Sequence, residues 1–573
     1  MNVKQLSRTS FSGRIWYIND HDSVRNHKDL SQVGATIMYN RGITNHNEID
    51  IFLNSKLKNT IVDPYKLKDM QKATERICQA IEQKQKILVF GDYDVDGVTS
   101  TCIMVRFLRD LGCLCEYFLP NRFSCGYGFS SDSFDHINND VDLIIVLDSG
   151  VNAVDAVEKA RGLGIDIVIC DHHLQTIDVL PNACAVVNPN RRDQDDIDGI
   201  HLKYLCAAGV TFMLIIAIRR YLKRRDIDID KYISVVALGT LCDVMKLQGI
   251  NRAVVKYTLD NPNYIPGLQA MLNCCGIENA RNSDDFAFFV GPLINAAGRI
   301  KDPTIALDIL LDDDYLSAVR KVTILQELNK TRKDIEKDVI KEAIAEIDTW
   351  DTDRRAICVH GDGWNEGVIG IVSGKLKEKY HKPSFVIAFN GDRGNGSARS
   401  VPGVNLELVF RNALAEGLLV KGGGHALAGG FEIERHKVGD FVSFLERECV
   451  YERDNRLNID YVITPDSNFD KIIDDLRILE PFGNGFAKPI FMMKNVIITN
   501  TKLSNNEQHL TLYFRTAISN TTMRGMIFHI ASKQQLIRGI NDNRTAKFDL
   551  AGFLNHSEQF GTSIIIEDVK LWE

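Results

Sequence analysis

The sequence predicts an α/β protein with two α/β lobes joined by a long helix and a small OB-like β-barrel at the C-terminal end. Three observations support this fold class. Apolar runs alternate with helical patterns between residues 87 and 170, residues 314–350 contain neither proline nor glycine, and short β-rich segments follow residue 451. Because 573 residues exceed what one hydrophobic core usually organises, we expect several domains.

The first lobe begins with an amphipathic helix. Ala73, Ile77, Ala80 and Ile81 recur at helical spacing before the apolar run 87–90, which is typical of a buried parallel strand. The same pattern repeats as a helix at 98–111, a strand at 143–147, a helix at 153–163 and a strand at 165–170. This alternation predicts a doubly wound sheet. The apolar stretch 207–218 is too short to cross a membrane, so we expect a buried helix there.

The second half of the chain contains the connecting helix, the second lobe and the barrel. The second lobe is expected to have a strand at 356–360, a helix at 368–380 and a strand at 384–389, and barrel strands are expected at 489–499, 509–514, 522–530 and 563–570. Residues 1–62 read as polar and irregular. The predicted division is an N-terminal segment (1–70), a catalytic domain (71–312), the long helix (313–350), a substrate-binding domain (351–450) and an OB-like domain (451–573).

Composition narrows the class of protein. With 45% hydrophobic and 25% charged residues, the chain is a folded protein, and no apolar run is long enough for a membrane span. The first 14 residues lack a signal-peptide pattern, and the 13 cysteines include no CxxC pair, so we expect a cytoplasmic protein with free thiols. A net charge of -8 argues against an indiscriminate polyanion binder but permits a local nucleic-acid groove.

Acidic residues follow the first predicted strand directly. Asp92, Asp94 and Asp96 alternate just beyond residues 87–90, at the strand end where open α/β sheets bind ligands. An EF-hand calcium loop is the alternative interpretation, because Gly97 also fits its first half. That loop needs a glutamate at its twelfth position, where this chain has Ile103, and it does not follow a buried strand.

Two further strands end in metal-binding residue types. Asp148 follows the strand 143–147, and Asp171, His172 and His173 follow the strand 165–170. Clustered carboxylates repel one another in a cleft, so a bound divalent cation is the simplest way to stabilise them. Oxygen ligands with one or two imidazoles suit Mn²⁺ or Mg²⁺ better than a structural zinc.

These motifs resemble those of the DHH phosphoesterase superfamily. The segment 92–97, the lone Asp148, the triplet 171–173 and the segment 238–243 are similar to its first four motifs. The resemblance implies that two ions, Mn²⁺ or Mg²⁺, are bound by Asp94, Asp96, Asp148, His172 and Asp243, with Asp148 as the bridge. Asp92 and Asp171 are expected to orient ligands, and His173 to act in catalysis by orienting ligands or contacting substrate.

The resemblance continues into the second lobe. Residues 423–430, a glycine cluster around His425, are similar to the signature of the DHHA1 substrate-binding domain. Glycines let backbone amides approach a phosphate, and His425 can donate to it during catalysis, although a packed turn is the alternative interpretation. The residues expected to bind phosphate or DNA are Arg122, Asn295, Arg299, Ser397, Arg399, Gly423 and Gly424.

The implied function is metal-dependent hydrolysis of single-stranded DNA from the 5′ end to 5′-mononucleotides, in DNA repair and recombination. We expect a monomer that does not bind membranes, with a single-stranded-DNA-binding protein or a helicase as candidate partners. One alternative is a phosphodiesterase of the same superfamily that acts on short oligoribonucleotides or cyclic dinucleotides. Another is a binding protein with an inactive site, but all expected ligands are present.

Overall fold

A computed structural model describes residues 3–6, 8–19, 27–122, 128–195, 202–350, 354–464, 467–504, 507–516, 522–530, 533–557 and 561–572. The chain forms two compact units. The larger unit comprises residues 56–452 and 483–485, and the smaller unit comprises residues 1–55, 453–482 and 486–573. The N-terminal residues thus belong to the same unit as the C-terminal barrel. The five-part division expected from the sequence stays a prediction.

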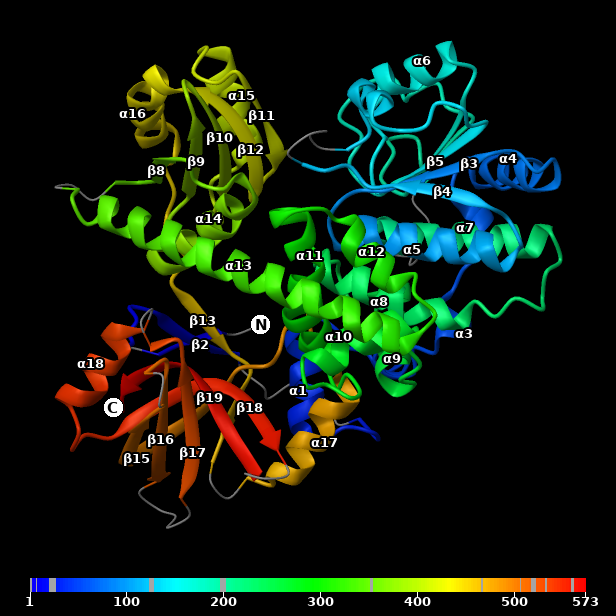
Figure 1. Ribbon diagram of the computed structural model, residues 1–573. Coiled ribbons are helices and arrows are strands. Elements are labelled where there is room, and N and C mark those ends of the chain that lie inside the picture. Colours follow the sequence, from blue (N-terminus) through cyan, green and yellow to red (C-terminus); the bar gives the residue numbers. More distant parts are fainter. Residues whose placement is uncertain are drawn as a thin grey trace. The chain divides into compact units, whose positions relative to one another are not determined.

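The first lobe of the larger unit is built on a parallel sheet with strand order β4-β3-β5-β6-β7 (Figure 1). This is the doubly wound arrangement that the alternating pattern predicts. Its strands are β3 (Ile87–Phe90), β4 (Cys115–Phe118), β5 (Leu143–Leu147), β6 (Asp166–Cys170) and β7 (Ala185–Val187).

Side chains of this sheet alternate between two cores. Leu88 and Phe90 pack with α6 (Val154–Gly162) on one face, while Ile87 and Val89 belong to the core that includes α4, α5, α7 and α8 on the other. Because both faces are covered, β3, β5 and β7 are apolar throughout. The helices of the second layer are α4 (Met70–Glu82), α5 (Val95–Asp110), α7 (Ala207–Tyr221) and α8 (Ile233–Cys242).

Further helices extend this lobe, and one of them connects it to the second lobe. The long connecting helix is α13 (Tyr315–Ile347), close to the range expected from the absence of proline and glycine. Asp314 caps its N-terminus, since its carboxylate accepts from the amides of Leu316 and Ser317. The other elements are α3 (Leu57–Thr60), α9 (Gly249–Asp260), α10 (Pro266–Cys274), the π-helix η5 (Asp285–Val290), α11 (Gly291–Ile300) and α12 (Thr304–Leu310).

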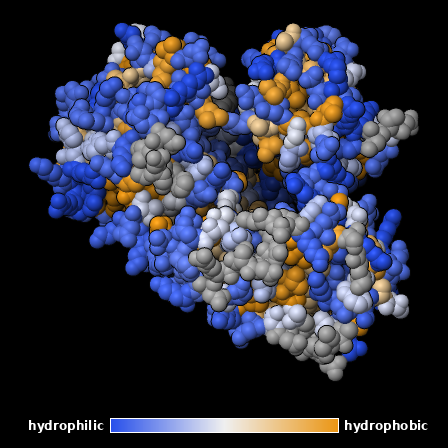
Figure 2. Space-filling view, turned by 180° about the vertical axis from the view of Figure 1, so that it is seen from behind, coloured by the Kyte–Doolittle hydropathy of each residue, from blue (hydrophilic) through white to orange (hydrophobic). Residues whose placement is uncertain are grey.

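The second lobe has a mixed sheet with strand order β11-β12-β10-β9-β8. Only β8 and β9 are parallel, and α14 packs on β9 and β10. The face in Figure 2 is largely hydrophilic and is hollowed between the two lobes of this unit. The elements are β8 (Ile357–Asp362), α14 (Glu366–Tyr380), β9 (Ser384–Asn390), β10 (Arg393–Arg399), α15 (Leu406–Ala415), β11 (Lys421–His425), β12 (Ala428–Glu434) and α16 (Val438–Glu448).

The smaller unit contains the predicted barrel. Its strands pair in the order β15-β16-β17-β19-β18, and pairing of β15 with β18 closes the sheet. The OB-like prediction is confirmed, although β18 was not among the expected strands. The elements are β14 (Tyr461–Ile463), α17 (Phe469–Leu479), β15 (Phe491–Leu503), β16 (His509–Thr516), β17 (Met523–Phe528), α18 (Gln534–Asp542), β18 (Phe548–Ser557) and β19 (Gly561–Leu571).

The prediction of an irregular N-terminal segment is wrong. Residues 32–40 and 46–53 are helical, and β2 pairs in parallel with β13, which lies more than 400 residues later. These helices are short and the strand pairing is distant in sequence, so neither produces a periodic pattern. The elements are β1 (Val3–Gln5), β2 (Ile15–Asn19), α1 (Gln32–Asn40), α2 (His46–Leu53) and β13 (Arg456–Ile459).

Candidate active site

The acidic segment after β3 forms the N-terminus of α5. Asp94 caps this helix, and its Oδ1 accepts hydrogen bonds from the amides of Asp96 at 2.9 Å and Gly97 at 3.2 Å. Asp96 lies in the first turn of the same helix. Its two carboxylate oxygens accept from the amides of Ala207 at 2.6 Å and Ala208 at 2.9 Å, at the N-terminus of α7. Two helix N-termini therefore fix these carboxylates in place.

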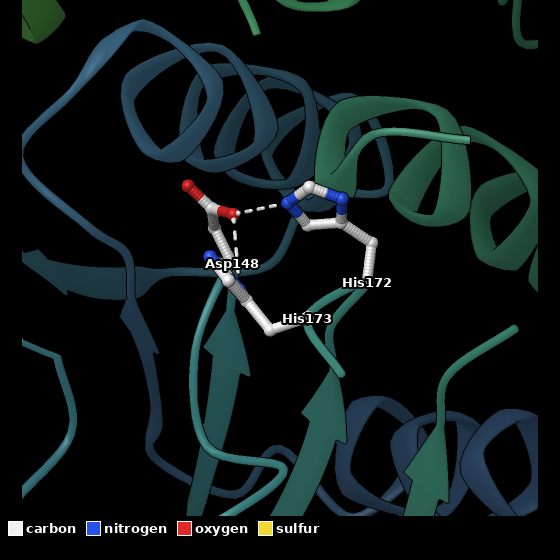
Figure 3. Close-up of side chains that lie close together, drawn as sticks. All are labelled: Asp148, His172 and His173. Carbon is white, nitrogen blue, oxygen red and sulfur yellow. Dashed lines mark ion pairs between the residues drawn. The ribbon is translucent and has the colours of Figure 1, made fainter. Parts of the chain in front are cut away.

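An imidazole nitrogen faces carboxylates from three different parts of the chain. Nε2 of His172 lies 3.3 Å from Oδ1 of Asp148, 3.6 Å from Oδ2 of Asp96 and 3.6 Å from Oδ2 of Asp243. Figure 3 shows Asp148 directed towards His172 at the ends of neighbouring strands. Potential ligand atoms of Asp96, His172 and Asp243 all lie within 4.8 Å of one another. This spacing is suited to a shared metal ion.

Asp148 is held in a strained and desolvated position. It is 2% exposed and has a φ of 60°, in the left-handed region that costs a non-glycine residue about 1 kcal/mol. Its Oδ1 is buried and accepts no hydrogen bond from the described residues. Burial raises the pKa of Asp148 well above its usual range, and the charges of Asp96 and Asp94 add to the shift. An orphaned carboxylate oxygen of this kind fits a cation ligand.

The same electrostatic conflict affects the surrounding acids. Burial and the charges of Asp96 and Asp94 raise the pKa of Asp243 to about 9. Burial and the charge of Asp94 raise the pKa of Asp92 to about 8. These carboxylates cannot all ionise together without a compensating positive charge. The donor set, rich in carboxylate oxygens with one imidazole, therefore fits a divalent cation such as Mn²⁺ or Mg²⁺.

Asp171 holds the two histidines in place through hydrogen bonds. Its Oδ1 accepts from the amide of His172 at 2.7 Å and lies 2.8 Å from Nδ1 of His173. Burial opposes ionisation of Asp171, but the hydrogen bond and charge of His173 prevail and lower its pKa to about 2. Burial likewise opposes protonation of His173, yet Asp171 raises its pKa to about 9. The hydrogen bond and charge of Asp171 thus favour the protonated form of His173.

Asn188 and Asn190 support the histidine loop, and neither was among the residues expected from the sequence. They follow β7, whose carboxyl end lies at the same edge of the sheet as those of β3, β5 and β6. Nδ2 of Asn190 donates to the carbonyl oxygen of His172 at 2.6 Å, and Nδ2 of Asn188 donates to that of His173 at 2.9 Å. The short apolar run before Asn188 was the signal that could have identified them.

Four arginines gather where the two lobes of the larger unit meet. Nη1 of Arg299 donates to the carbonyl oxygen of Gly367 at 2.8 Å, and Arg122 lies over the ring of Tyr93 at 4.3 Å. Burial, together with the nearby charges of Arg122, Arg332 and Arg399, lowers the pKa of Arg299 to about 10. Such a concentration of guanidinium groups is suited to a phosphate.

Arg332 is an addition to the predicted residues. It lies on α13, is 9% exposed, and its Nη1 donates to Oε2 of Glu336 at 2.6 Å. In the sequence it is one of many charges along a polar helix, so only the fold distinguishes it. Asn295 lies on α11 four residues before Arg299, which places it one turn away on the same side of the helix.

The second-lobe candidates share one face of a sheet. The glycine cluster forms a hairpin of β11 and β12, in which His425 pairs with Ala428 and Gly423 with Gly430, while Gly424 pairs with Gly429. On the other side of β12, Ala428 pairs with Arg399 and Gly430 with Ser397. Paired side chains point to the same face, so Ser397, Arg399 and His425 line one surface with glycines between them. Among the described residues, no hydrogen bond or ion pair joins this surface to the carboxylate cluster.

Comparison with known families matches the parallel-sheet lobe, the second lobe and the barrel. The chain matches the DHH family, N-terminal domain, at residues 86–240, the DHHA1 domain at 353–450 and the RecJ OB domain at 459–565. The crystal structure of RecJ in complex with Mn²⁺ from Thermus thermophilus is similar in fold, with a TM-score of 0.79 at 24% identity. The similarity covers 97% of this chain and 80% of that one.

Curated relatives align with most of the chain. The single-stranded-DNA-specific exonuclease RecJ of Escherichia coli is 31% identical over 535 residues, which cover 88% of this chain and 90% of that protein. The protein of the same name from Bacillus subtilis is 30% identical and covers 91% of this chain, and the match spans 66% of that longer relative. The Salmonella typhimurium RecJ is 30% identical with 96% of its length covered. The chain therefore belongs to the RecJ family of the DHH phosphoesterases.

Proposed function

We propose that this protein is a metal-dependent exonuclease that hydrolyses single-stranded DNA from the 5′ end and releases 5′-mononucleotides, in DNA repair and recombination. The convergence of Asp96, Asp148 and Asp243 on Nε2 of His172 carries the proposal, because it supplies a hydrolytic metal centre in a family of single-stranded-DNA-specific exonucleases. A related structure, 29% identical with a TM-score of 0.58, is that of exonuclease RecJ bound to manganese.

The proposed ligands are Asp94, Asp96, Asp148, His172 and Asp243. These residues would hold two Mn²⁺ or Mg²⁺ ions, which would supply activation of a water molecule and stabilisation of the leaving oxygen of an in-line displacement. The chain contributes prepositioned ligands. Asp96 is fixed by two backbone amides, Asp94 by its capping hydrogen bonds, and the His172 backbone by Asp171 and Asn190.

His173 is the proposed electrostatic contact to the reacting phosphate. Its hydrogen bond to the buried Asp171 keeps the imidazole protonated and fixes its orientation. A cationic donor in a partly buried position stabilises negative charge that develops on a phosphate oxygen. Asp92, whose Oδ1 accepts from the amide of Tyr93 at 2.7 Å, supports the turn that presents Asp94 and Asp96.

The arginines provide a basis for 5′-end recognition. A terminal phosphate has one more negative charge than an internal phosphodiester, so Arg122, Arg299 and Arg399 favour the end over the middle of a strand. Ser397, Asn295 and His425 add hydrogen-bond donors, and Gly423 and Gly424 let the strand approach the sheet closely. In this proposal the second lobe positions the strand against the metal centre.

The RecJ OB domain match at 459–565 favours a long strand over the short oligoribonucleotides or cyclic dinucleotides of the alternative. None of the helices in the described ranges is long and apolar enough to cross a membrane.

We place the enzyme in the cytoplasm as a monomer. A single-stranded-DNA-binding protein or a helicase would supply its substrate.

A substrate panel tests this proposal. The purified protein is incubated with Mn²⁺ and with equal amounts of single-stranded DNA, duplex DNA or RNA of the same sequence, and product lengths are followed by electrophoresis. We expect mononucleotides from single-stranded DNA, far slower digestion of the duplex, and no reaction after chelation. Preferential cleavage of RNA dinucleotides or cyclic dinucleotides would support the alternative function.

A further inference from the structure

A cluster of buried charges lies on the connecting helix α13, outside the set of residues proposed to bind phosphate. Arg332 is 9% exposed and Glu336 is 3% exposed. The two side chains lie one turn apart, and Nη1 of Arg332 donates to Oε2 of Glu336 at 2.6 Å. Nζ of Lys375, on α14, forms an ion pair with Oε1 of the same carboxylate. Because a buried charge without its partner is costly, the carboxylate holds both cations in place.

The guanidinium of Arg332 is fixed on two sides. Its Nε and Nη2 both donate to Oδ1 of Asn329, at 3.1 and 2.9 Å, while Glu336 accepts from Nη1. Asn329 lies three residues before Arg332 and Glu336 four residues after it, so all three share one side of α13. Of the five N–H groups, one on Nη1 and one on Nη2 have no partner among the described residues. Two N–H groups on neighbouring nitrogens suit bidentate contact with a phosphate.

Arg332 belongs to the arginine cluster where the two lobes of the larger unit meet. Burial, and then the charges of Arg122, Arg332 and Arg399, lower the pKa of Arg299 to about 10. The helix that carries Arg299, α11, packs against α13. Because like charges repel, a long basic side chain without restraint would turn away from this cluster. The anchoring carboxylate and amide on α13 oppose that movement.

We infer that Arg332 is a further guanidinium contact to the 5′-terminal phosphate and that Glu336 is the positioning residue that holds it there. The inference rests on the proposed function for the identity of the strand end. Glu336 does not touch the phosphate, because its carboxylate would repel it. It keeps the two remaining N–H groups of Arg332 in one direction, which reduces the side-chain entropy lost on binding. Lys375 fixes the second carboxylate oxygen from α14.

The test compares a 5′-phosphorylated strand with a 5′-hydroxyl strand of the same sequence. The ratio of kcat/KM for the two strands measures the preference for a terminal phosphate. Arg332→Gln should lower this ratio about tenfold and Glu336→Gln about fivefold, because the phosphate loses a prepositioned guanidinium. The Mn²⁺ concentration at half-maximal rate should not change, because neither residue is a proposed metal ligand. The charge-conserving variants Arg332→Lys and Glu336→Asp should also lower the ratio, since neither keeps the planar fork in its original position.

A double variant tests whether Glu336 acts through Arg332. Arg332→Gln/Glu336→Gln should show the same ratio as Arg332→Gln alone, because the carboxylate has nothing to position once the guanidinium is absent. Glu342→Ala is the matched control, since Glu342 lies on the same helix and its Oε2 accepts from Nε1 of Trp364 at 2.7 Å. This control should lower the melting temperature but leave the ratio unchanged. A purely structural Glu336 would behave in the same way.

Binding measured with a chelator separates this inference from the proposed function. The affinities of the full-length protein for 3′-labelled strands with and without the 5′-phosphate give the same preference without hydrolysis. Loss of that preference in the folded single variants, without further loss in the double variant, supports the inference. An unchanged preference in either folded variant, additive losses, or a parent protein without any preference would overturn it. A parent protein that prefers the 5′-phosphate in binding but does not hydrolyse the strand refutes the proposed function alone.

Discussion

Asp148 lowers the stability of the fold but is suited to binding a metal ion. Its φ of 60° strains the backbone, and its buried carboxylate faces the charges of neighbouring acids. A residue under such conditions adds little to folding stability in the absence of a cation. Metal binding explains why an aspartate occupies this position, because a bound cation attracts each carboxylate and offsets the repulsion between them.

Replacement of this carboxylate should separate activity from stability. We expect Asp148→Asn to lower turnover at least about 100-fold, while the melting temperature of the chelated protein does not fall, because a neutral amide removes the repulsion and asparagine tolerates a positive φ. Turnover and thermal unfolding with a chelator measure the two effects. Near-normal turnover in saturating Mn²⁺ would rule out the bridging role.

Arg399 should determine preference for the end of the strand. In Arg399→Ala the ratio of the rate on a 5′-phosphorylated strand to the rate on a 5′-hydroxyl strand should fall about tenfold, because one guanidinium partner of the phosphate is lost. Arg393→Ala is the control, since Arg393 begins the same strand and pairs with Glu432. An equal loss on both substrates would mean that Arg399 only follows the DNA backbone.

Close packing of α11 against α14 joins the two lobes at the level of helices. A Cβ atom on Gly367, in the first turn of α14, would overlap the carbonyl oxygen of Arg299. Glycine at this position therefore permits the hydrogen bond from Arg299 to Gly367. The same contact brings Arg299 towards Ser397 and Arg399, which lie beside Gly370 of that helix.

Two alanine substitutions on α14 should have opposite effects. Gly367→Ala should lower both the melting temperature and turnover, since the two helices must separate. Gly374→Ala meets nothing within 4 Å and should raise stability by about 0.5–1 kcal/mol, because alanine is the better helix former. Thermal unfolding and DNA hydrolysis of both variants check this expectation. A neutral Gly367→Ala would show that the lobes do not depend on this contact.

Strand-end chemistry was predictable from the sequence because it is local. Each of β3, β5 and β6 contains a continuous apolar run that ends within two residues of its acid or histidine, so these strands and the residues at their ends could be expected. The supporting contacts were not predictable in this way. Asn190 and Arg332 act through partners far away in the sequence, and their local patterns are those of a loop and a polar helix.

At the scale of the whole molecule, pairing between strands that are far apart in the sequence limited how much of the fold could be predicted. The N-terminal strand β2 pairs with β13, and β15 with β18, so both closures depend on contacts with no local signature. The parallel sheet, the long helix and most barrel strands were expected because each has its own periodic pattern. The chemistry nevertheless requires several parts of the chain, with metal ligands in one lobe and the proposed phosphate donors in both lobes.

The central claim is a metal-dependent exonuclease that begins at the 5′ end of a single strand, and a strand with different labels at its two ends tests it most directly. With Mn²⁺ present, we expect the 5′ label to appear first as a mononucleotide, while the 3′ label remains on progressively shorter strands. Chelation should stop release of both labels. Release of the 3′ label first as a mononucleotide, or undiminished release without a metal, would contradict this claim.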